Sequence, residues 1–277
     1  ILLWIRILIT TCDKYSEDVD LALDREFLGF KGDISRTQVG KLKDASNKYI
    51  SNDFYNALQA EFQNAGITDV KLQIVDRKDP DDDPVKIEII YPAIVEYTEY
   101  IQPRVLIEIG SRSLREPFTV CSFRSIIGDE FPNQPFADSF IEIACVNPER
   151  TFLEKLFLLH EEHQRPLEKM KIERKSRHLY DIEKISKTEF AAKAIEDKDL
   201  YKSIVAHRER FTKIGGVNYL THFPPTLNPI PPIETIALWE KDYKEMQEQM
   251  IKEDSLPFEK LIAEIQSTVN QINKIEF

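Results

Sequence analysis

The sequence has 277 residues, of which 42% are hydrophobic and 31% are charged, with a formal net charge of -11 and a pI of about 5.1. These values predict a globular protein with an ordinary core, in one large domain or two smaller ones. They exclude attraction of nucleic acid by the overall charge, so any RNA contact has to come from a local basic patch. Three scattered cysteines, Cys12, Cys121 and Cys145, predict free thiols in a reducing, cytoplasmic compartment.

The first ten residues, ILLWIRILIT, are apolar but too short to span a bilayer, and Arg6 interrupts them. They also lack the polar flank and the cleavage site of a signal peptide. We therefore expect a buried strand here and no contact with a membrane. The chain opens on Ile1 rather than Met, which leaves open a start further upstream.

The next stretch, YSEDVDLALD, places two aspartates two residues apart in an apolar run. In a strand, Asp18 and Asp20 emerge on one face while Val19 and Leu21 point to the other. Two carboxylates at a strand end can share a divalent cation, and oxygen ligation suits Mg²⁺ that carries a substrate phosphate. Alternatively, this is an edge strand whose polar face is solvated.

Turn signals and alternation then predict a helical region followed by several strands. The helical region spans about 35–65, with Ser51 as a possible N-cap and Gly66 as a stop signal. VKLQIVD and VKIEIIY alternate around a charged turn and predict a hairpin. Further strands are expected at RVLIEIG, FTVCSF and FIEIACV.

From NPERTFLEKLFLLHEE onward the pattern is helical to the end of the chain. The Pro-rich interval His222–Pro232 breaks this half and predicts a stiff linker or a packed loop. Two antiparallel helices are expected after it. The sequence thus predicts an α+β protein with an α/β domain at 1–147 and a helical domain at 148–277.

A third carboxylate on a neighbouring strand would complete a two-metal site, and three strands offer one. Glu88 shares its face with Lys86, which predicts an ordinary solvated position. Glu108 lies on an otherwise apolar face, where an ionised carboxylate needs a partner such as a cation. Glu142 has a similar setting, so burial alone does not choose between these two.

The helical half carries a run of basic residues between Arg165 and Asp181. They predict either a patch for phosphates or RNA backbone, or a solvated helix face. Lys155 emerges beside an apolar stripe and is a candidate phosphate ligand or a surface lysine with an extended stem. His160 and His163 predict a polar helix face, because no third metal ligand has a clear spacing. The basic residues are Arg165, Lys169, Lys171, Arg174, Lys175 and Arg177.

Four segments in this order, YSEDVDLALD, RVLIEIGSRSLREPF, ERTFLEKLFLLHEE and RHLYDI, resemble the AbiEii/AbiGii-type nucleotidyltransferases, which are toxins of bacterial type IV toxin-antitoxin systems. The resemblance spans roughly 15–185. It implies a nucleotidyltransferase fold of the DNA polymerase β type, a mixed sheet with flanking helices, followed by a helical region. It also implies Mg²⁺ or Mn²⁺, a nucleoside triphosphate, an acceptor such as tRNA or another RNA, and a cognate antitoxin.

Carried over motif by motif, the resemblance implies a role for six residues. Asp18 and Asp20 would be metal ligands, and Glu108 would be the third acid. Lys155 would contact the triphosphate, and Asp181 would complete the pocket beside Arg177. The spacing of those last two residues on one helix face also fits a structural ion pair.

The chain departs from the family pattern in its first segment. The family has a glycine-rich G-G-T/S element before the paired aspartates, where backbone N–H groups approach phosphates closely. The first glycine of this chain is Gly29, and only Thr10 and Thr11 offer hydroxyls nearby. Gly215-Gly216 fits a helix C-cap better. Two hypotheses follow: a Mg²⁺-dependent nucleotidyltransferase impaired by this loss, or a noncatalytic binding module for an antitoxin or RNA.

Overall fold

The chain folds into two compact units, described here from a computed structural model for residues 3–5, 18–76, 84–94, 96–98, 100–111, 118–212, 214–251 and 254–277. The first unit holds the strands and comprises Asp18–Pro92 and Arg104–Asn147 together with the strand Leu3–Ile5. The second unit comprises Ala93–Pro103 and Pro148–Phe277 and is helical. Within the described residues, no helix is long and apolar enough to cross a membrane.

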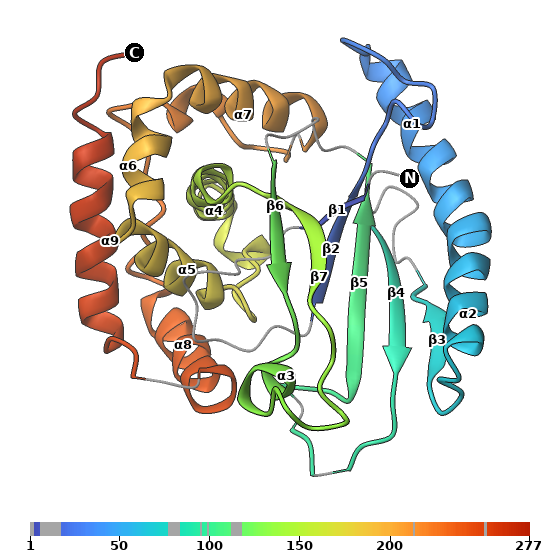
Figure 1. The fold of residues 1–277 in the computed structure, drawn as a ribbon. Helices are drawn as coiled ribbons and strands as arrows, with labels where there is room; N and C mark the ends of the chain where they lie inside the picture. Colours follow the sequence, from blue (N-terminus) through green and yellow to red (C-terminus); the bar gives the residue numbers. More distant parts are fainter. Residues whose placement is uncertain are drawn as a thin grey trace. The chain divides into compact units, whose positions relative to one another are not determined.

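The first unit is built on a mixed sheet, whose described residues form seven strands in the order β3-β4-β5-β2-β1-β7-β6 (Figure 1). β2 runs parallel to β5 and β1 parallel to β7, whereas the other neighbours are antiparallel. Each strand predicted from alternation is present, including a short one in the first ten residues. The bounds are Leu3–Ile5 (β1), Asp18–Leu23 (β2), Lys71–Ile74 (β3), Val85–Ile90 (β4), Arg104–Gly110 (β5), Phe118–Phe123 (β6) and Ile141–Val146 (β7).

A continuous helical segment packs on one face of this sheet. It comprises α1 (Arg36–Tyr49), a π-helical turn (Ile50–Phe54) and α2 (Tyr55–Asn64). Ser35 begins it with a capping box, in which its hydroxyl accepts from the Gln38 backbone N–H and the Gln38 side chain accepts from the Ser35 N–H. The predicted N-cap at Ser51 is wrong, because that residue lies inside the π-helical turn. Gly66, with φ +73, ends the helix as predicted.

Strand alternation gives the sheet one apolar and one polar face around β2, β5 and β4. The apolar residues pack with the helical segment in a single cluster that includes Ile50. Register places the acidic residues of the three strands on the opposite face. The apolar cluster has Leu23, Val85, Ile87, Ile107 and Ile109 among its buried strand residues.

The cysteines outside the first segment are free thiols, as predicted. Cys121 lies on β6 and the buried Cys145 on β7. Burial and the neighbouring Cys121 raise the pKa of the Cys145 thiol to about 11, so it is protonated at neutral pH. Cys12 lies outside the described residues.

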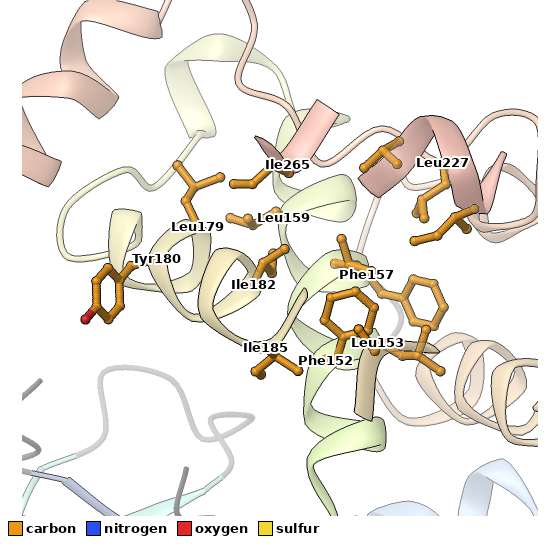
Figure 2. Packing of buried hydrophobic residues seen from close by; sticks show 14 of the residues in the cluster. Phe152, Leu153, Phe157, Leu159, Leu179, Tyr180, Ile182, Ile185, Leu227 and Ile265 are labelled. Carbon is orange, nitrogen blue, oxygen red and sulfur yellow. The ribbon is translucent and has the colours of Figure 1, made fainter. Parts of the chain in front are cut away.

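The second unit packs its helices around one apolar core (Figure 2). α4 packs against α5, α6 and α7, while α5 also packs against α8 and α9. In α9 the buried residues recur every three or four positions, at Leu261, Ile265, Val269 and Ile272, which gives the helix a single apolar face. The bounds are Pro148–His163 (α4), Ser176–Ser186 (α5), Glu189–Glu196 (α6), Lys198–Phe211 (α7), Ile236–Met250 (α8) and Phe258–Ile272 (α9). A short helix, Ile126–Glu130 (α3), belongs to the first unit.

The Pro-rich interval is a packed loop, which decides between the two predicted alternatives. Leu227 is buried in the core of the second unit, and Asn273 of the α9 C-cap donates a hydrogen bond to its backbone oxygen at 2.9 Å. The interval therefore lies within this unit. The predicted C-cap at Gly215-Gly216 is wrong, because α7 ends at Phe211 and the glycines form a later turn.

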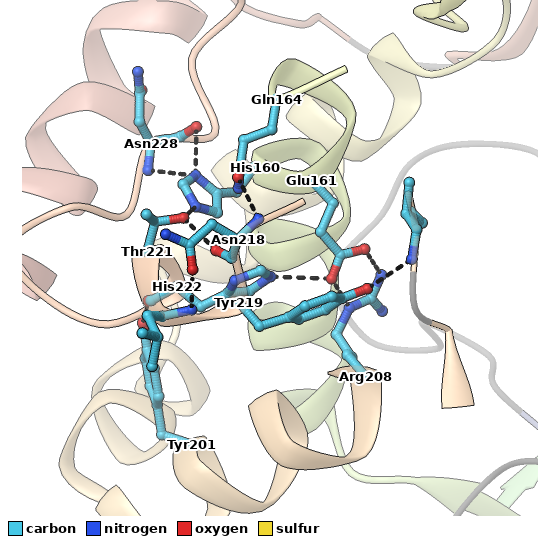
Figure 3. Close-up of polar contacts among 12 residues, drawn as sticks. His160, Glu161, Gln164, Tyr201, Arg208, Asn218, Tyr219, Thr221, His222 and Asn228 are labelled. Atoms are coloured by element: carbon cyan, nitrogen blue, oxygen red, sulfur yellow. Dashed lines mark hydrogen bonds and ion pairs between the residues drawn. The ribbon is translucent and has the colours of Figure 1, made fainter. Parts of the chain in front are cut away.

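A buried polar cluster connects α4 with α7 and the loop that follows it (Figure 3). Glu161 is fully buried, and Arg208 binds its two carboxylate oxygens at 2.6 Å and 2.5 Å. The ring of His222 lies 3.0 Å from the same carboxylate. Burial alone would raise the pKa of Glu161, but the hydrogen bonds from Arg208 and His222 outweigh it and lower that pKa.

The predicted polar helix face is wrong, because His160 is buried and His163 is partly buried. Nδ1 of His160 lies 3.0 Å from the backbone nitrogen and 3.1 Å from the backbone oxygen of Asn228, and Nε2 lies 2.9 Å from the Thr221 hydroxyl. His163 has both ring nitrogens buried and packs edge-on against Trp239. Burial lowers the pKa of His160 to about 4 and that of His163 to about 3.

These depressed pKa values predict acid sensitivity. Both histidines are neutral in the folded protein and take up protons on unfolding. Their contribution to the free energy of unfolding is therefore fully present above pH about 6.5. It is lost as the pH falls from there toward the folded-state pKa values of about 4 for His160 and about 3 for His163. Each histidine should cost about 2 kcal/mol by pH 5, at about 1.4 kcal/mol per pH unit. Urea unfolding at pH 7.5 and pH 5.0 measures the difference. His163→Phe should remove about half of it, and equal stability at both pH values would refute the assignment.

Candidate functional site

The paired aspartates lie on one face of β2, beside a glutamate of the parallel strand β5. Asp20 pairs with Glu108 in the register, and Asp18 pairs with Leu106. Partners in register point to the same side of a sheet, so the three carboxylates share one face. All three residues are partly buried. β2 is an interior strand of the sheet, which excludes the solvated edge strand weighed above.

Glu108 has a cationic partner within the sheet. Lys86 lies opposite it on β4, and the two side chains are ion-paired. Asp20, Glu108 and Lys86 therefore form one row across β2, β5 and β4. The predicted apolar setting of Glu108 is therefore wrong, because Asp20 and Lys86 flank it on the same face. Lys86 supplies the cationic partner of this carboxylate, so burial alone does not call for a metal at Glu108.

Glu88 is buried rather than solvated, which corrects the prediction from its neighbour in the sequence. Only 9% of the residue is exposed, and it is ion-paired with Arg104 of β5. The Gln73 side chain donates a second hydrogen bond to it at 2.7 Å. Sequence alternation correctly placed Glu88 and Lys86 on one face. It could not show that each of these two residues is ion-paired with a residue of β5 and not with the other.

Glu142 lies away from the paired aspartates. It is exposed on β7, and β1 separates that strand from β2. Ile5 of β1 pairs with Leu21 of β2 on one side and with Cys145 of β7 on the other. Glu142 is therefore two strands away from β2, and it lies three residues along β7 from the residue that is level with Leu21. Of the three candidate acids, Glu108 is the one adjacent in register to Asp20.

In the second unit the structure brings Lys155 and Asp181 together. The Lys155 ammonium on α4 lies 2.8 Å from the Asp181 carboxylate on α5, and both side chains are largely buried. The same ammonium lies 3.4 Å from Nδ1 of His178. Lys155 is therefore not a solvated surface lysine. Arg177 is partly buried and lies one turn before Asp181 on the same helix.

The basic segment is largely engaged within the protein. Glu162 of α4 is buried and ion-paired with both Arg165 and Lys175. It also accepts from the Lys171 backbone N–H at 2.6 Å. Burial alone would raise the pKa of Glu162, but these hydrogen bonds and charges lower it. The segment before α5 is thus a loop anchored on a carboxylate and not a solvated helix face.

Arg174 is likewise a packed residue, at a positive φ of 59. Its guanidinium lies over the Tyr100 ring, 4.9 Å from the centroid, and its backbone N–H donates to Asp242 at 2.6 Å. Of the six basic residues predicted as a patch, only Lys169 and Lys171 are exposed. The predicted RNA surface is therefore reduced to these two lysines.

The residues present suit a magnesium ion held by two carboxylates. Mg²⁺ binds through one or two carboxylates together with substrate phosphates and water. Asp18 and Asp20 offer such oxygens from one strand face. Among the described residues, no three His, Cys, Asp or Glu side chains form a group that could hold a metal. The segment 6–17, where the family's glycine element would fall, lies outside the described residues.

Sequence reasoning missed Lys86 and His178 as members of these sites. The signal for Lys86 was its position two residues before Glu88, which puts it on the acidic face. The signal for His178 was its spacing of three residues from Asp181 on one helix, which brings the two side chains together. Neither signal identifies the partner residue, because Glu108 and Lys155 lie 22 and 23 residues away along the chain.

The mixed sheet, the paired aspartates of β2, the glutamate opposite Asp20 on the parallel strand β5 and the helical region that follows in the chain match the fold that the family resemblance implies. The family model for the AbiEii nucleotidyl transferase toxin of type IV toxin-antitoxin systems matches residues 13–264, and the chain belongs to this family. A comparison with curated proteins gives no match. Membership confirms the resemblance seen in the sequence and implies a nucleotide substrate and an antitoxin partner.

Proposed function

We propose that this chain is a Mg²⁺-dependent or Mn²⁺-dependent nucleotidyltransferase that transfers a nucleotide from a nucleoside triphosphate to an acceptor such as tRNA. The observation that carries the proposal is the register of β2 and β5, which sets Asp20 beside Glu108 with Asp18 on the same face. In this reaction an acceptor hydroxyl gives up its proton to water and its oxygen attacks the α-phosphorus. The bond between the α-phosphorus and the oxygen that bridges to the β-phosphorus breaks, and pyrophosphate leaves.

Each site residue has a role that follows from its contacts. Asp18 and Asp20 hold the ion, which when bound neutralises phosphate charge. The Lys155 ammonium has three hydrogen atoms, and Asp181 and His178 orient it through two of them. The remaining N–H can donate to a phosphate oxygen, which is the role that the family resemblance implies for Lys155. Arg177 adds positive charge on the helix that carries Asp181.

The missing glycine element supports a second candidate function. The segment before the aspartates contains no glycine, so its backbone is not free of side chains where phosphates would approach. A chain of this fold can still bind a nucleotide, an RNA or an antitoxin without turning substrate over. Both candidates place the ligand at the paired aspartates, and they differ in whether pyrophosphate is released.

Binding at the paired aspartates is tested by thermal unfolding. Mg²⁺ and a nucleoside triphosphate together should raise stability, by about 2.7 kcal/mol at about 100 times the dissociation constant. Asp20→Asn should abolish this increase, because it removes a metal ligand. The exposed Asp69→Asn, elsewhere in the same unit, is the matched control and should keep it. An increase that survives in Asp20→Asn would remove the aspartates from the site.

A further inference from the structure

The acidic face of β4 and β5 contains its own cations. Glu108 is ion-paired with Lys86, and Glu88 is ion-paired with Arg104. Both pairs join β4 to β5, which is the strand beside β2. These two strands therefore neutralise their glutamates with side chains of the protein.

We propose that Asp18 and Asp20 hold a single divalent cation, and that Lys86, positioned by Glu108, supplies the second positive charge of this site. The inference rests on the proposed function and deepens it. It assigns to an ammonium group the place that a second metal ion takes in a two-metal site. Lys86 becomes a positioning and charge-supplying residue, and Glu108 becomes its anchor rather than a metal ligand.

The register puts Lys86 within reach of a phosphate bound at Asp20. Neighbouring strands lie about 4.8 Å apart, so the backbones of Asp20 and Lys86 are separated by roughly 10 Å, with Glu108 between them. The ammonium of Lys86 is bound to the Glu108 carboxylate, which lies next to Asp20. The side chain is 43% exposed, so it can meet a ligand without a change in the fold.

The ligand chemistry also favours one ion. Of the three carboxylates on this face, that of Glu108 is already ion-paired with Lys86, which leaves Asp18 and Asp20 as the proposed ligands. Two carboxylates with phosphate oxygens suffice for one Mg²⁺. To bind a second ion, Glu108 would have to leave Lys86, and that ammonium would then lie beside the incoming cation. Like charges at such distances repel, which disfavours the second ion.

The test is a titration with Mn²⁺ alone, in which electron paramagnetic resonance counts the bound ions. The full chain should bind one Mn²⁺, and Asp20→Asn should lose it. Glu108→Gln should keep one ion with an affinity within about twofold. Lys86→Met should gain a second ion, because it releases the Glu108 carboxylate. Lys71→Met, at an exposed lysine on the same face of β3, is the matched control and should bind one.

The outcomes separate this inference from the proposed function. Two ions in the unmodified chain, both lost in Asp20→Asn, would overturn the inference and leave the metal role of the aspartates standing. A tenfold or greater loss of affinity in Glu108→Gln would also overturn it, whether or not Lys86→Met folds. Mn²⁺ binding that is unchanged in Asp20→Asn would overturn both this inference and the proposed function.

Discussion

Nucleotide transfer should become roughly 100- to 1000-fold faster when the segment before Tyr15 is replaced by one carrying a G-G-T/S element. The segment before Tyr15 has no glycine, so it does not supply the preorganised backbone donors of a G-G-T/S element. One such donor is typically worth about 2.7 to 4 kcal/mol of transition-state stabilisation. The measurement compares initial rates of labelling of total tRNA by the two chains, with Mg²⁺ and each nucleoside triphosphate in turn.

The control for this comparison is Asp18→Ala in both chains. It should abolish labelling, because Asp18 is proposed to hold the ion. Equal rates in the unmodified and restored chains, both sensitive to Asp18→Ala, would show that the glycine element is dispensable here. Binding of nucleotide should differ much less than the rate, since Asp18, Asp20 and Lys155 are common to both chains.

Arg208→Met should lower the free energy of unfolding by about 3–5 kcal/mol. The substitution leaves the carboxylate of Glu161 buried without its bidentate partner, and breaking a buried ion pair from one side carries a penalty of this size. The ring of His222 would remain near the carboxylate but could not replace two guanidinium hydrogen bonds. Equilibrium unfolding in urea measures the loss.

Two further variants test whether the loss of stability in Arg208→Met comes from the burial of the Glu161 charge. Lys193→Met breaks the solvent-exposed pair with Glu189 and should leave the stability close to that of the unmodified protein. The double variant Arg208→Met/Glu161→Met removes both buried charges and should recover much of the lost stability. A loss below about 1 kcal/mol in Arg208→Met would contradict the importance of this pair.

Alternation along the chain was enough to predict the strands of the first unit. Val19 and Leu21 face the apolar cluster, and Asp18 and Asp20 face the other side, because a strand alternates its side chains. Register was not predictable in this way. The opposition of Asp20 and Glu108 joins strands that are far apart in the sequence, and no local pattern encodes it.

In the helical second unit, too, contacts between distant segments could not be predicted from the local sequence pattern. His160 was predicted on a polar face, yet its partners are Thr221 and Asn228, which lie 61 and 68 residues away. Helical spacing shows which residues share a face, but a polar residue on that face can be satisfied by solvent or by a distant loop. The Lys155–Asp181 pair illustrates the same point, because the family resemblance implied one site for both residues and the ion pair between them is visible only in the fold.

The fate of the α-phosphate tests the central claim most directly. The restored chain is incubated with Mg²⁺, total tRNA and a nucleoside triphosphate labelled at either the α- or the γ-phosphate. A nucleotidyltransferase places the α label in RNA and releases the γ label as pyrophosphate, and Asp18→Ala does neither. Label from the γ-phosphate in RNA, or no transfer from any nucleotide despite binding that depends on Asp20, would contradict nucleotidyl transfer by this site.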